Sequence, residues 1–239
     1  MNEDFTAGVL HDLENPENEM GSEDGGEIVP REPVPPRSWI LERRPDGAVV
    51  LDLARHPSAR YVPERFRDHP VEVPGALLGV IARWGRAPGA CLYFSGAVGR
   101  GKTQLAWVAA LAWLDKAGAG AWTGDLEYFA VPHLFEELRR SFDSRGGTDI
   151  VDRCVRAKLL FLDDFGAERV SEWTRERMLE IVNERYDHKR PVIVTSNLAP
   201  DELEAGQEPR LVSRLTQMCD GFVVHAGGHD RRRGGQAGL

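Results

Sequence analysis

Cysteine is scarce in this chain. The 239 residues include three, Cys91, Cys154 and Cys219, with no two at metal-binding or disulfide-framework spacing. We therefore expect neither a zinc site nor a disulfide scaffold, and a reducing cytoplasm is the default compartment. Long apolar runs are also lacking, since none approaches the ~18 residues of a membrane span. The acidic first twenty residues lack the basic start and apolar core of a signal peptide. We expect a cytoplasmic protein without a transmembrane helix.

The negative charge is concentrated at the N-terminus. Residues 1–32 hold ten acids and one arginine, a net charge of −9, whereas the whole chain carries −8. The body is therefore nearly neutral, and the overall acidity does not exclude binding to nucleic acid. Residues 1–36 are rich in Glu, Asp, Asn, Gly and Pro. Such a segment buries too little apolar surface to offset its ordering entropy. We expect a disordered acidic tail there, with a solvating role favoured over docking to a partner.

The rest of the chain alternates apolar runs with helical patterns. A Pro-Asp-Gly turn between two apolar runs indicates a hairpin in a short extension over residues 37–61, followed by one α/β domain over residues 62–239. Strands that alternate with helices are typical of a parallel sheet covered on both faces. The strands are expected at residues 91–94, 121–123, 158–162, 191–195 and 221–224, and the helices at 76–84, 102–116, 134–142 and 171–188.

A phosphate-binding loop carries the strongest functional signal. Residues 96–103, GAVGRGKT, match G-x-x-x-x-G-K-[ST], in which the backbone N–H groups and the following helix N-terminus face phosphate oxygens. Lys102 is expected to bridge the β- and γ-phosphates, and Thr103 to place its hydroxyl on Mg²⁺. A glycine-rich turn without a ligand is disfavoured, because the loop follows a strand and opens a helix. The expected nucleotide-binding residues are Gly96, Ala97, Val98, Gly99, Arg100, Gly101, Lys102 and Thr103.

Polar residues follow two of the other expected strands. In LLFLDDFG, Asp163 is the natural Mg²⁺ partner, and Asp164 lies where a carboxylate could orient the attacking water. The alternative, a pair of exposed turn acids, is disfavoured by the phosphate loop. Asn197, in VIVTSNL, could reach the water or the γ-phosphate, although Ser196 or Asn197 could instead cap a following helix. Arg210 and Arg214 share a face of an expected helix, for which a solvated basic face is the alternative.

These motifs, in this order, resemble the AAA+ ATPases, and within them the DnaC/DnaI/IstB group of helicase loaders and transposon helper ATPases. The resemblance runs from about Tyr61 to Arg232 and includes FSGAVGRGKTQLA, LLFLDDFGAE, VIVTSNL and RLVSRL. It implies a P-loop core with a five-stranded parallel sheet flanked by helices, and a reduced or absent C-terminal lid, since little chain follows Arg214. It also implies ATP and Mg²⁺ as cofactors and an ATP-dependent homo-oligomer.

The resemblance also assigns roles to single residues. Asn197 is similar to the first sensor, Arg214 to the arginine finger that reaches a neighbouring subunit's ATP, and Arg231 to the second sensor. Arg139 and Arg140 are the implied contacts to single-stranded DNA. The implied activity is an ATPase that loads a replicative helicase onto single-stranded DNA during replication.

Three other functions are alternatives to this one. The first is a helper ATPase whose partner is a transposase. The second is a nucleotide-gated binding module with negligible turnover, which Asp164 motivates because most AAA+ proteins have the longer Glu there. The third, a small-molecule kinase, is disfavoured because it leaves the SNL and SRL segments unexplained.

Overall fold

A computed structural model of the chain describes residues 39–117, 126–143, 147–166, 171–205 and 208–227. The expected tail over residues 1–36, the strand expected at 121–123 and Arg231 lie outside these ranges. The chain divides into two compact units, Met1–Gly85 with Leu111–Gly120, and Arg86–Ala110 with Ala121–Leu239. The predicted division into a tail, an extension and a domain that begins at residue 62 stays a prediction.

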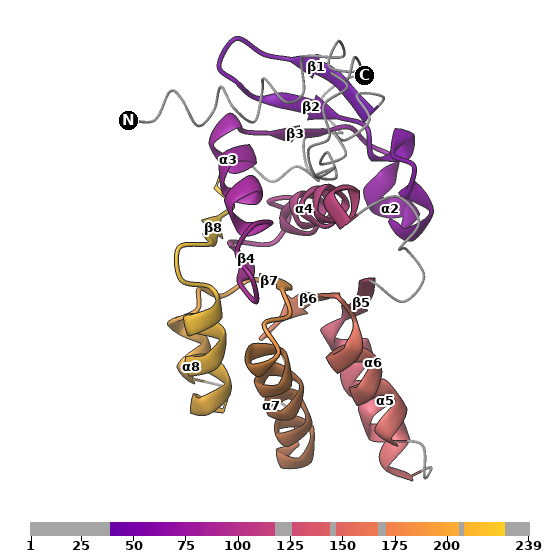
Figure 1. Cartoon of the computed structure of the whole chain (residues 1–239), viewed down its shortest axis with the longest axis vertical. Helices are drawn as coiled ribbons and strands as arrows, with labels where there is room; N and C mark the ends of the chain where they lie inside the picture. The colour runs from indigo at the N-terminus through magenta and orange to yellow at the C-terminus, as the bar shows by residue number, and fades with distance from the viewer. Residues whose placement is uncertain (1–38, 118–125, 144–146, 167–170, 206–207, 228–239) are drawn as a thin grey trace, which may run out of the picture. The chain divides into compact units, whose positions relative to one another are not determined.

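The first unit contains a three-stranded antiparallel sheet in the order β1-β2-β3 (Figure 1). Asp46 and Gly47 form the turn between the first two strands, with the Asp46 carboxylate accepting the Ala48 N–H at 3.0 Å and Gly47 at a φ of 79°. The strands are β1 (Ile40–Arg43), β2 (Val49–Leu51) and β3 (Val71–Val73), and the α-helices are α2 (Glu64–Arg67) and α3 (Gly75–Trp84).

A buried polar pair ties two segments of the first unit together. His56 Nε2 lies 2.9 Å from Asp115 Oδ2, and His56 Nδ1 accepts the Ser58 N–H at 3.0 Å. Since Nδ1 is an acceptor, the ring proton is on Nε2 and is donated to the Asp115 carboxylate. The pair joins the segment after the short 3₁₀ helix Leu53–Arg55 to the end of the helix that contains Asp115.

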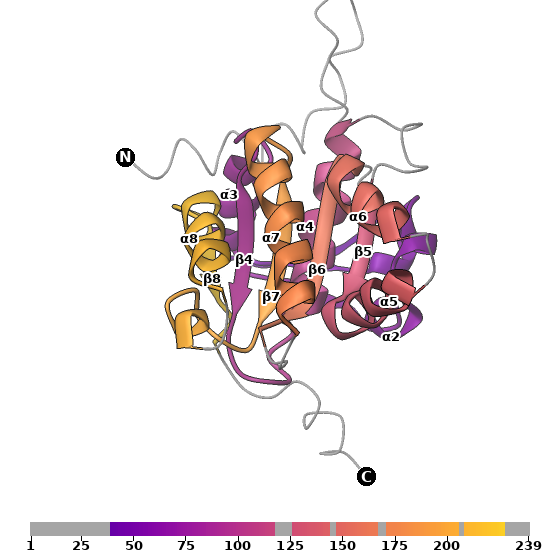
Figure 2. The same cartoon turned by 90° about the horizontal axis from the view of Figure 1, so that it is seen from below.

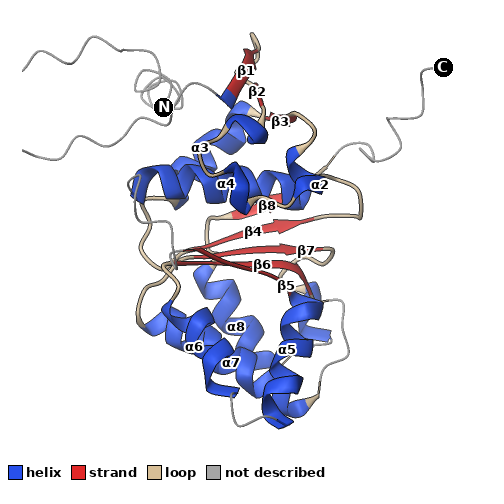
Figure 3. Cartoon of the chain, turned by 90° about the vertical axis from the view of Figure 1, so that its right-hand side faces the viewer, coloured by secondary structure: helices blue, strands red, loops and turns tan. Residues whose placement is uncertain are grey.

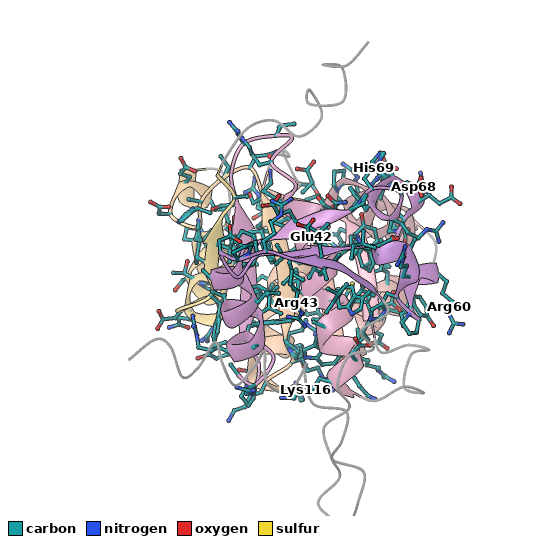
Figure 4. All side chains as sticks on the ribbon, turned by 90° about the horizontal axis from the view of Figure 1, so that it is seen from above. Glu42, Arg43, Arg60, Asp68, His69 and Lys116 are labelled. Atoms are coloured by element: carbon teal, nitrogen blue, oxygen red, sulfur yellow. The ribbon has the colours of Figure 1, made fainter. Side chains whose placement is uncertain are left out.

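Exposed charged side chains of both signs lie on the described part of the first unit. Figure 4 shows Glu42 and Arg43 on β1, and Arg60, Asp68 and His69 in the segment that contains α2, all of them exposed. Arg44 pairs with Glu72 at 2.8 Å. Mixed signs are typical of a solvated surface, whereas a phosphate-binding surface is dominated by basic residues.

The second unit is built on a five-stranded parallel sheet in the order β5-β6-β7-β4-β8 (Figure 2). All five residues of β4 and of β7 are buried, as expected for parallel strands with both faces covered. The strands are β4 (Cys91–Ser95), β5 (Leu126–Ala130), β6 (Leu159–Phe165), β7 (Val192–Ser196) and β8 (Val223–His225).

Helices cover both faces of this sheet. Figure 3 shows α5, α6, α7 and α8 on one face and α4 on the other. Their bounds are α4 (Lys102–Ala117), α5 (Val131–Asp143), α6 (Gly147–Arg156), α7 (Glu172–Asp187) and α8 (Pro209–Met218), with a 3₁₀ helix, η4 (Glu202–Ala205), before the last. The α/β fold class predicted from the sequence is confirmed. The described residues end at Gly227, two residues after β8, so the predicted reduced or absent lid stays a prediction.

Two expectations need correction. The sheet gains its edge strand at Leu126–Ala130, a segment that the sequence pattern did not indicate. Its residues are mostly half-buried and do not alternate between buried and exposed positions, because an edge strand is only partly covered. The strand β6 does not end before the two acids but continues through both to Phe165.

None of the described helices combines the length and hydrophobicity that a membrane span requires.

Arg185 of α7 is fully buried and binds main-chain carbonyl groups of three segments. Its guanidinium donates to the oxygens of Cys154 (2.7 Å), Ala157 (2.8 Å) and Pro191 (2.6 Å), which lie in α6, before β6 and before β7. Burial lowers the pKa of Arg185 to about 9, so the side chain remains a cation at neutral pH. The positive group lies where the carbonyl groups at the end of α6 need hydrogen-bond donors.

Replacing Arg185 by methionine is expected to destabilise the chain by about 3–5 kcal/mol, because it leaves several buried carbonyl groups without donors. Denaturant unfolding of the full chain measures this change. The control is Arg156→Met, which removes an exposed arginine 3.5 Å from Asp152 and should cost less than about 1 kcal/mol. Equal losses in the two variants would contradict the structural role of Arg185.

Candidate nucleotide-binding site

The phosphate loop connects β4 to α4. Gly96 directly follows β4, and α4 begins at Lys102. Gly96, Gly99 and Gly101 have positive φ angles of 138°, 81° and 80°. A side chain at Gly96 would also place its Cβ atom 2.6 Å from the Ala226 carbonyl oxygen, so only glycine fits there. The backbone is therefore curled at three points before the helix, as a phosphate-binding loop requires.

The Lys102 ammonium group lies within the loop. Its Nζ atom donates to Gly96 O (2.7 Å), Ala97 O (3.0 Å) and Asn197 Oδ1 (2.9 Å), and the residue is 8% exposed. These acceptors are neutral oxygens, and a phosphate oxygen is a stronger, charged acceptor for the same group. The loop therefore holds a cation beside the N-terminus of α4, where an anionic ligand is favoured.

Asp163 is held by three hydroxyl groups from three different elements. Its Oδ1 atom accepts hydrogen bonds from Thr103 Oγ1 (2.7 Å) and Thr195 Oγ1 (2.6 Å), and its Oδ2 atom accepts one from Tyr128 (3.1 Å). Asp163 is only 5% exposed. Both carboxylate oxygens are thus fixed, and the carboxylate is joined directly to the Thr103 hydroxyl at the start of α4.

Asp164 lies at a bulge in β6. Leu162 pairs with Val194 and Phe165 pairs with Ser196, so β6 has one residue more than β7 over this stretch. Asp164 has a φ of 61°, a left-handed conformation uncommon for a residue other than glycine. In a regular strand two adjacent side chains point to opposite faces, whereas a bulge changes their direction and is often found beside functional sites.

Asn197 connects the second acid to the phosphate loop. Its Nδ2 atom donates to Asp164 Oδ1 at 3.2 Å, while its Oδ1 atom accepts from Lys102. The main-chain N–H of Asp164 donates to Thr195 Oγ1 at 2.9 Å, and the same hydroxyl donates to Asp163. Both acids, the lysine and the asparagine therefore belong to one hydrogen-bonded network at the carboxyl ends of β4, β6 and β7.

Ser196 has a local role in this network. Its Oγ atom donates to Phe165 O at 2.6 Å and accepts the Leu198 N–H at 3.0 Å. The next helix, η4, begins only at Glu202. The hydroxyl of Ser196 thus closes the turn after β7, and the Asn197 amide reaches into the site instead of capping a helix.

Three predicted site residues, Arg139, Arg140 and Arg214, lie on α5 and α8. Arg214 of α8 places its guanidinium 4.4 Å from the Tyr186 ring centroid and donates to Gln217 at 3.3 Å. Arg139 and Arg140 are exposed on α5, and Arg140 pairs with Glu136 at 3.2 Å. Val98 is exposed and Arg100 half-buried within the loop, and Arg231 lies outside the described residues.

Two residues of the network were not predicted from the sequence. Thr195 is a polar residue within the apolar run VIVTS. A polar residue at such a position is a signal from which its role could have been predicted. Tyr128 belongs to β5, the unpredicted strand, and its ring lies 5.0 Å from the Trp107 ring and 5.1 Å from the Phe161 ring. This packing fixes the phenol beside Asp163.

The groups gathered at Thr103 and Asp163 are of the kind that binds Mg²⁺. Hydroxyl and carboxylate oxygens are hard ligands, and Mg²⁺ in proteins typically uses one or two such groups together with waters and phosphate oxygens. Thr103 donates its proton to Asp163, so the lone pairs of its oxygen remain available. The residues present therefore fit Mg²⁺ beside a bound nucleotide.

Known proteins similar to this chain include ATP-binding proteins and a helicase loader. A family model described as IstB-like ATP binding protein matches residues 89–226. The chain is 29% identical over 114 residues to the replicative helicase loader DnaI of Bacillus subtilis, covering 47% of this chain and 35% of that protein. It is 26% identical over 166 residues to a protein of a Mycobacterium tuberculosis insertion sequence that is named for ATP binding, covering 67% and 63% of the two chains. The chain spans only 32–37% of the length of the Bacillus subtilis relatives that it matches.

The fold has counterparts among solved structures. The crystal structure of the DnaC helicase loader superposes with a TM-score of 0.57 at 24% identity, covering 69% of this chain and 100% of that one. Identity at this level supports the fold alone, whereas the family model matches more than half of this chain. The chain therefore belongs to the IstB-like ATP-binding proteins, the family of helicase loaders and transposon ATPases with the AAA+ P-loop fold.

Proposed function

We propose that this chain binds and hydrolyses ATP with Mg²⁺ as an assembly factor in DNA replication. The observation that carries the proposal is the single network that joins the phosphate loop to the two acids of β6. Lys102, Asn197 and Asp164 form one side of it, and Thr103 and Asp163 form the other.

Each residue has a chemical role in this proposal. The backbone of residues 96–103 and the Lys102 ammonium would bind the phosphates, and the Thr103 hydroxyl and the Asp163 carboxylate would hold Mg²⁺. When bound, Mg²⁺ would offset the negative charge of the phosphate oxygens. Asp164, exposed and beside Asn197, is placed to orient water and accept its proton.

The proposed client is a replicative helicase on single-stranded DNA. The similarity to the replicative helicase loader DnaI supports it. Arg139 is an exposed candidate for a DNA phosphate contact, and Arg140 would have to exchange its pairing with Glu136 for one. The resemblance to AAA+ ATPases implies assembly through ATP, so we propose an ATP-dependent homo-oligomer, with Arg214 reaching the ATP of a neighbouring subunit and Arg231 acting as the second sensor.

A second candidate client is a transposase. The family model and the insertion-sequence relative from Mycobacterium tuberculosis favour it, and the latter aligns over more of this chain than DnaI does. Affinity purification from the native host with an Asp164→Asn variant, which should retain ATP, separates the two candidates. Recovery of a replicative helicase supports the loader, and recovery of a transposase supports the transposition helper.

The nucleotide site is tested by Lys102→Ala. We expect ATP affinity to fall by about 10–100-fold, because the variant removes a charged hydrogen-bond donor to the phosphates. Titration of a fluorescent ATP analogue measures the change. Lys116→Ala, in the last turn of the same helix, is the control and should bind like the wild type. An unchanged affinity in Lys102→Ala would refute the proposed site.

A further inference from the structure

We propose that Thr195 is a positioning residue that sets both acids of β6 for the Mg²⁺-dependent reaction. The proposal rests on the function proposed above and adds a residue to it. Thr195 touches neither the phosphate loop nor an exposed surface in the contacts described, since its hydroxyl binds the two acids and the residue is 1% exposed. Its effect on the reaction is therefore exerted through Asp163 and Asp164.

The hydroxyl of Thr195 is used in both directions. A hydroxyl has one proton to donate and two lone pairs with which to accept. Thr195 donates its proton to Asp163 Oδ1 at 2.6 Å and accepts the Asp164 N–H at 2.9 Å. One atom of β7 thus fixes the side chain of the first acid and the main chain of the second.

The bulge explains why this link is needed. The ladder between β6 and β7 is irregular between Leu162 and Phe165, so the regular strand pairing does not hold the two residues in between. Asp164 is also in a left-handed conformation, which persists only where the surroundings enforce it. The bond from its N–H to Thr195 is the described contact that holds its main chain there.

Tyr128 offers a comparison within the same site. Its hydroxyl donates to Asp163 Oδ2 at 3.1 Å and makes no described contact with Asp164. Removing the Tyr128 hydroxyl should loosen the Mg²⁺-binding carboxylate alone, whereas removing the Thr195 hydroxyl should disturb both acids. Tyr128→Phe is therefore a matched variant for Thr195→Val.

The test measures Mg²⁺ dependence separately from nucleotide binding. A fluorescent ADP analogue is titrated onto the full chain in EDTA, and the complex is then titrated with Mg²⁺. For Thr195→Val we expect binding in EDTA within about 2-fold of the wild type and a Mg²⁺ requirement raised about 10–100-fold, the usual effect of losing a group that orients a metal ligand. ATP turnover should fall over the same range. Thr195→Ser, which keeps the hydroxyl, should restore both values to within about 3-fold of the wild type.

The outcomes separate this inference from the function on which it rests. A wild-type chain that binds nucleotide with no effect of Mg²⁺ would overturn the proposed function. A wild-type chain that responds to Mg²⁺, with Thr195→Val indistinguishable from it, overturns only the role of Thr195. Equal losses with and without Mg²⁺, unrelieved by serine, would show a purely structural role and also overturn the proposal. If the valine variant does not fold, Thr195→Cys, a weaker donor of similar size, is measured in its place with the same expected direction.

Discussion

Replacing Arg214 by alanine should reduce partner-stimulated ATP turnover by about 10³–10⁵-fold and leave ATP binding intact. Arg214 lies on α8, where its guanidinium is over the Tyr186 ring and bonded to Gln217. Neither contact belongs to the network around Lys102 and Asp163. An arginine held on an aromatic ring is ordered without being neutralised by a carboxylate, so it can serve the ATP of another subunit. Phosphate release and nucleotide affinity are measured in parallel.

The neighbouring Arg210 supplies the control for Arg214. It is exposed one turn earlier on α8, and Arg210→Ala should keep most of the stimulated turnover. Mixing Arg214→Ala with Lys102→Ala should restore part of the activity, because each chain supplies what the other lacks. Undiminished turnover in Arg214→Ala alone would remove the assignment of the arginine finger.

Replacing Asp164 by asparagine should lower turnover by about 10²–10⁴-fold, the range expected when a general base is removed. ATP binding should stay near the wild-type value, because Asp164 binds Asn197 and the Thr195 hydroxyl and makes no described contact with the loop. Single-turnover measurements with pre-bound ATP separate the chemical step from product release.

Asp163→Asn is the comparison for Asp164→Asn. It should raise the Mg²⁺ concentration that nucleotide binding requires, whereas Asp164→Asn should leave that concentration unchanged. Similar effects of the two variants on Mg²⁺ dependence would contradict the separate roles of the two acids.

Much of the second unit was predictable from its sequence. The buried strands β4 and β7 are short apolar runs that end in polar residues. In an α/β chain this pattern indicates a buried parallel strand. The phosphate loop is equally clear, because three glycines have the positive φ angles that its pattern implies. Asp163 and Asn197 were predicted to lie near the loop because each follows an apolar run, and in the structure both join the hydrogen-bonded network of the loop.

The bulge in β6 was not predictable, because it depends on pairing between distant segments. The run LLFLDDF gives no sign that β6 has one residue more than β7 at the acids, or that Asp164 adopts a φ of 61°. The same holds for β5, where partial covering obscures the alternation, and for Tyr128, whose contact with Asp163 exists only once β5 and β6 pair. Local patterns specify elements, whereas such contacts arise from register.

Phosphate release by the wild-type chain with ATP, Mg²⁺ and single-stranded DNA, before and after addition of the client recovered from the host, tests the central claim most directly. The proposed function predicts release that requires Mg²⁺, rises with DNA or client, and falls by about 10²–10⁴-fold in Asp164→Asn. Tight ATP binding with release at background under every condition would contradict it and identify a nucleotide-gated binding module.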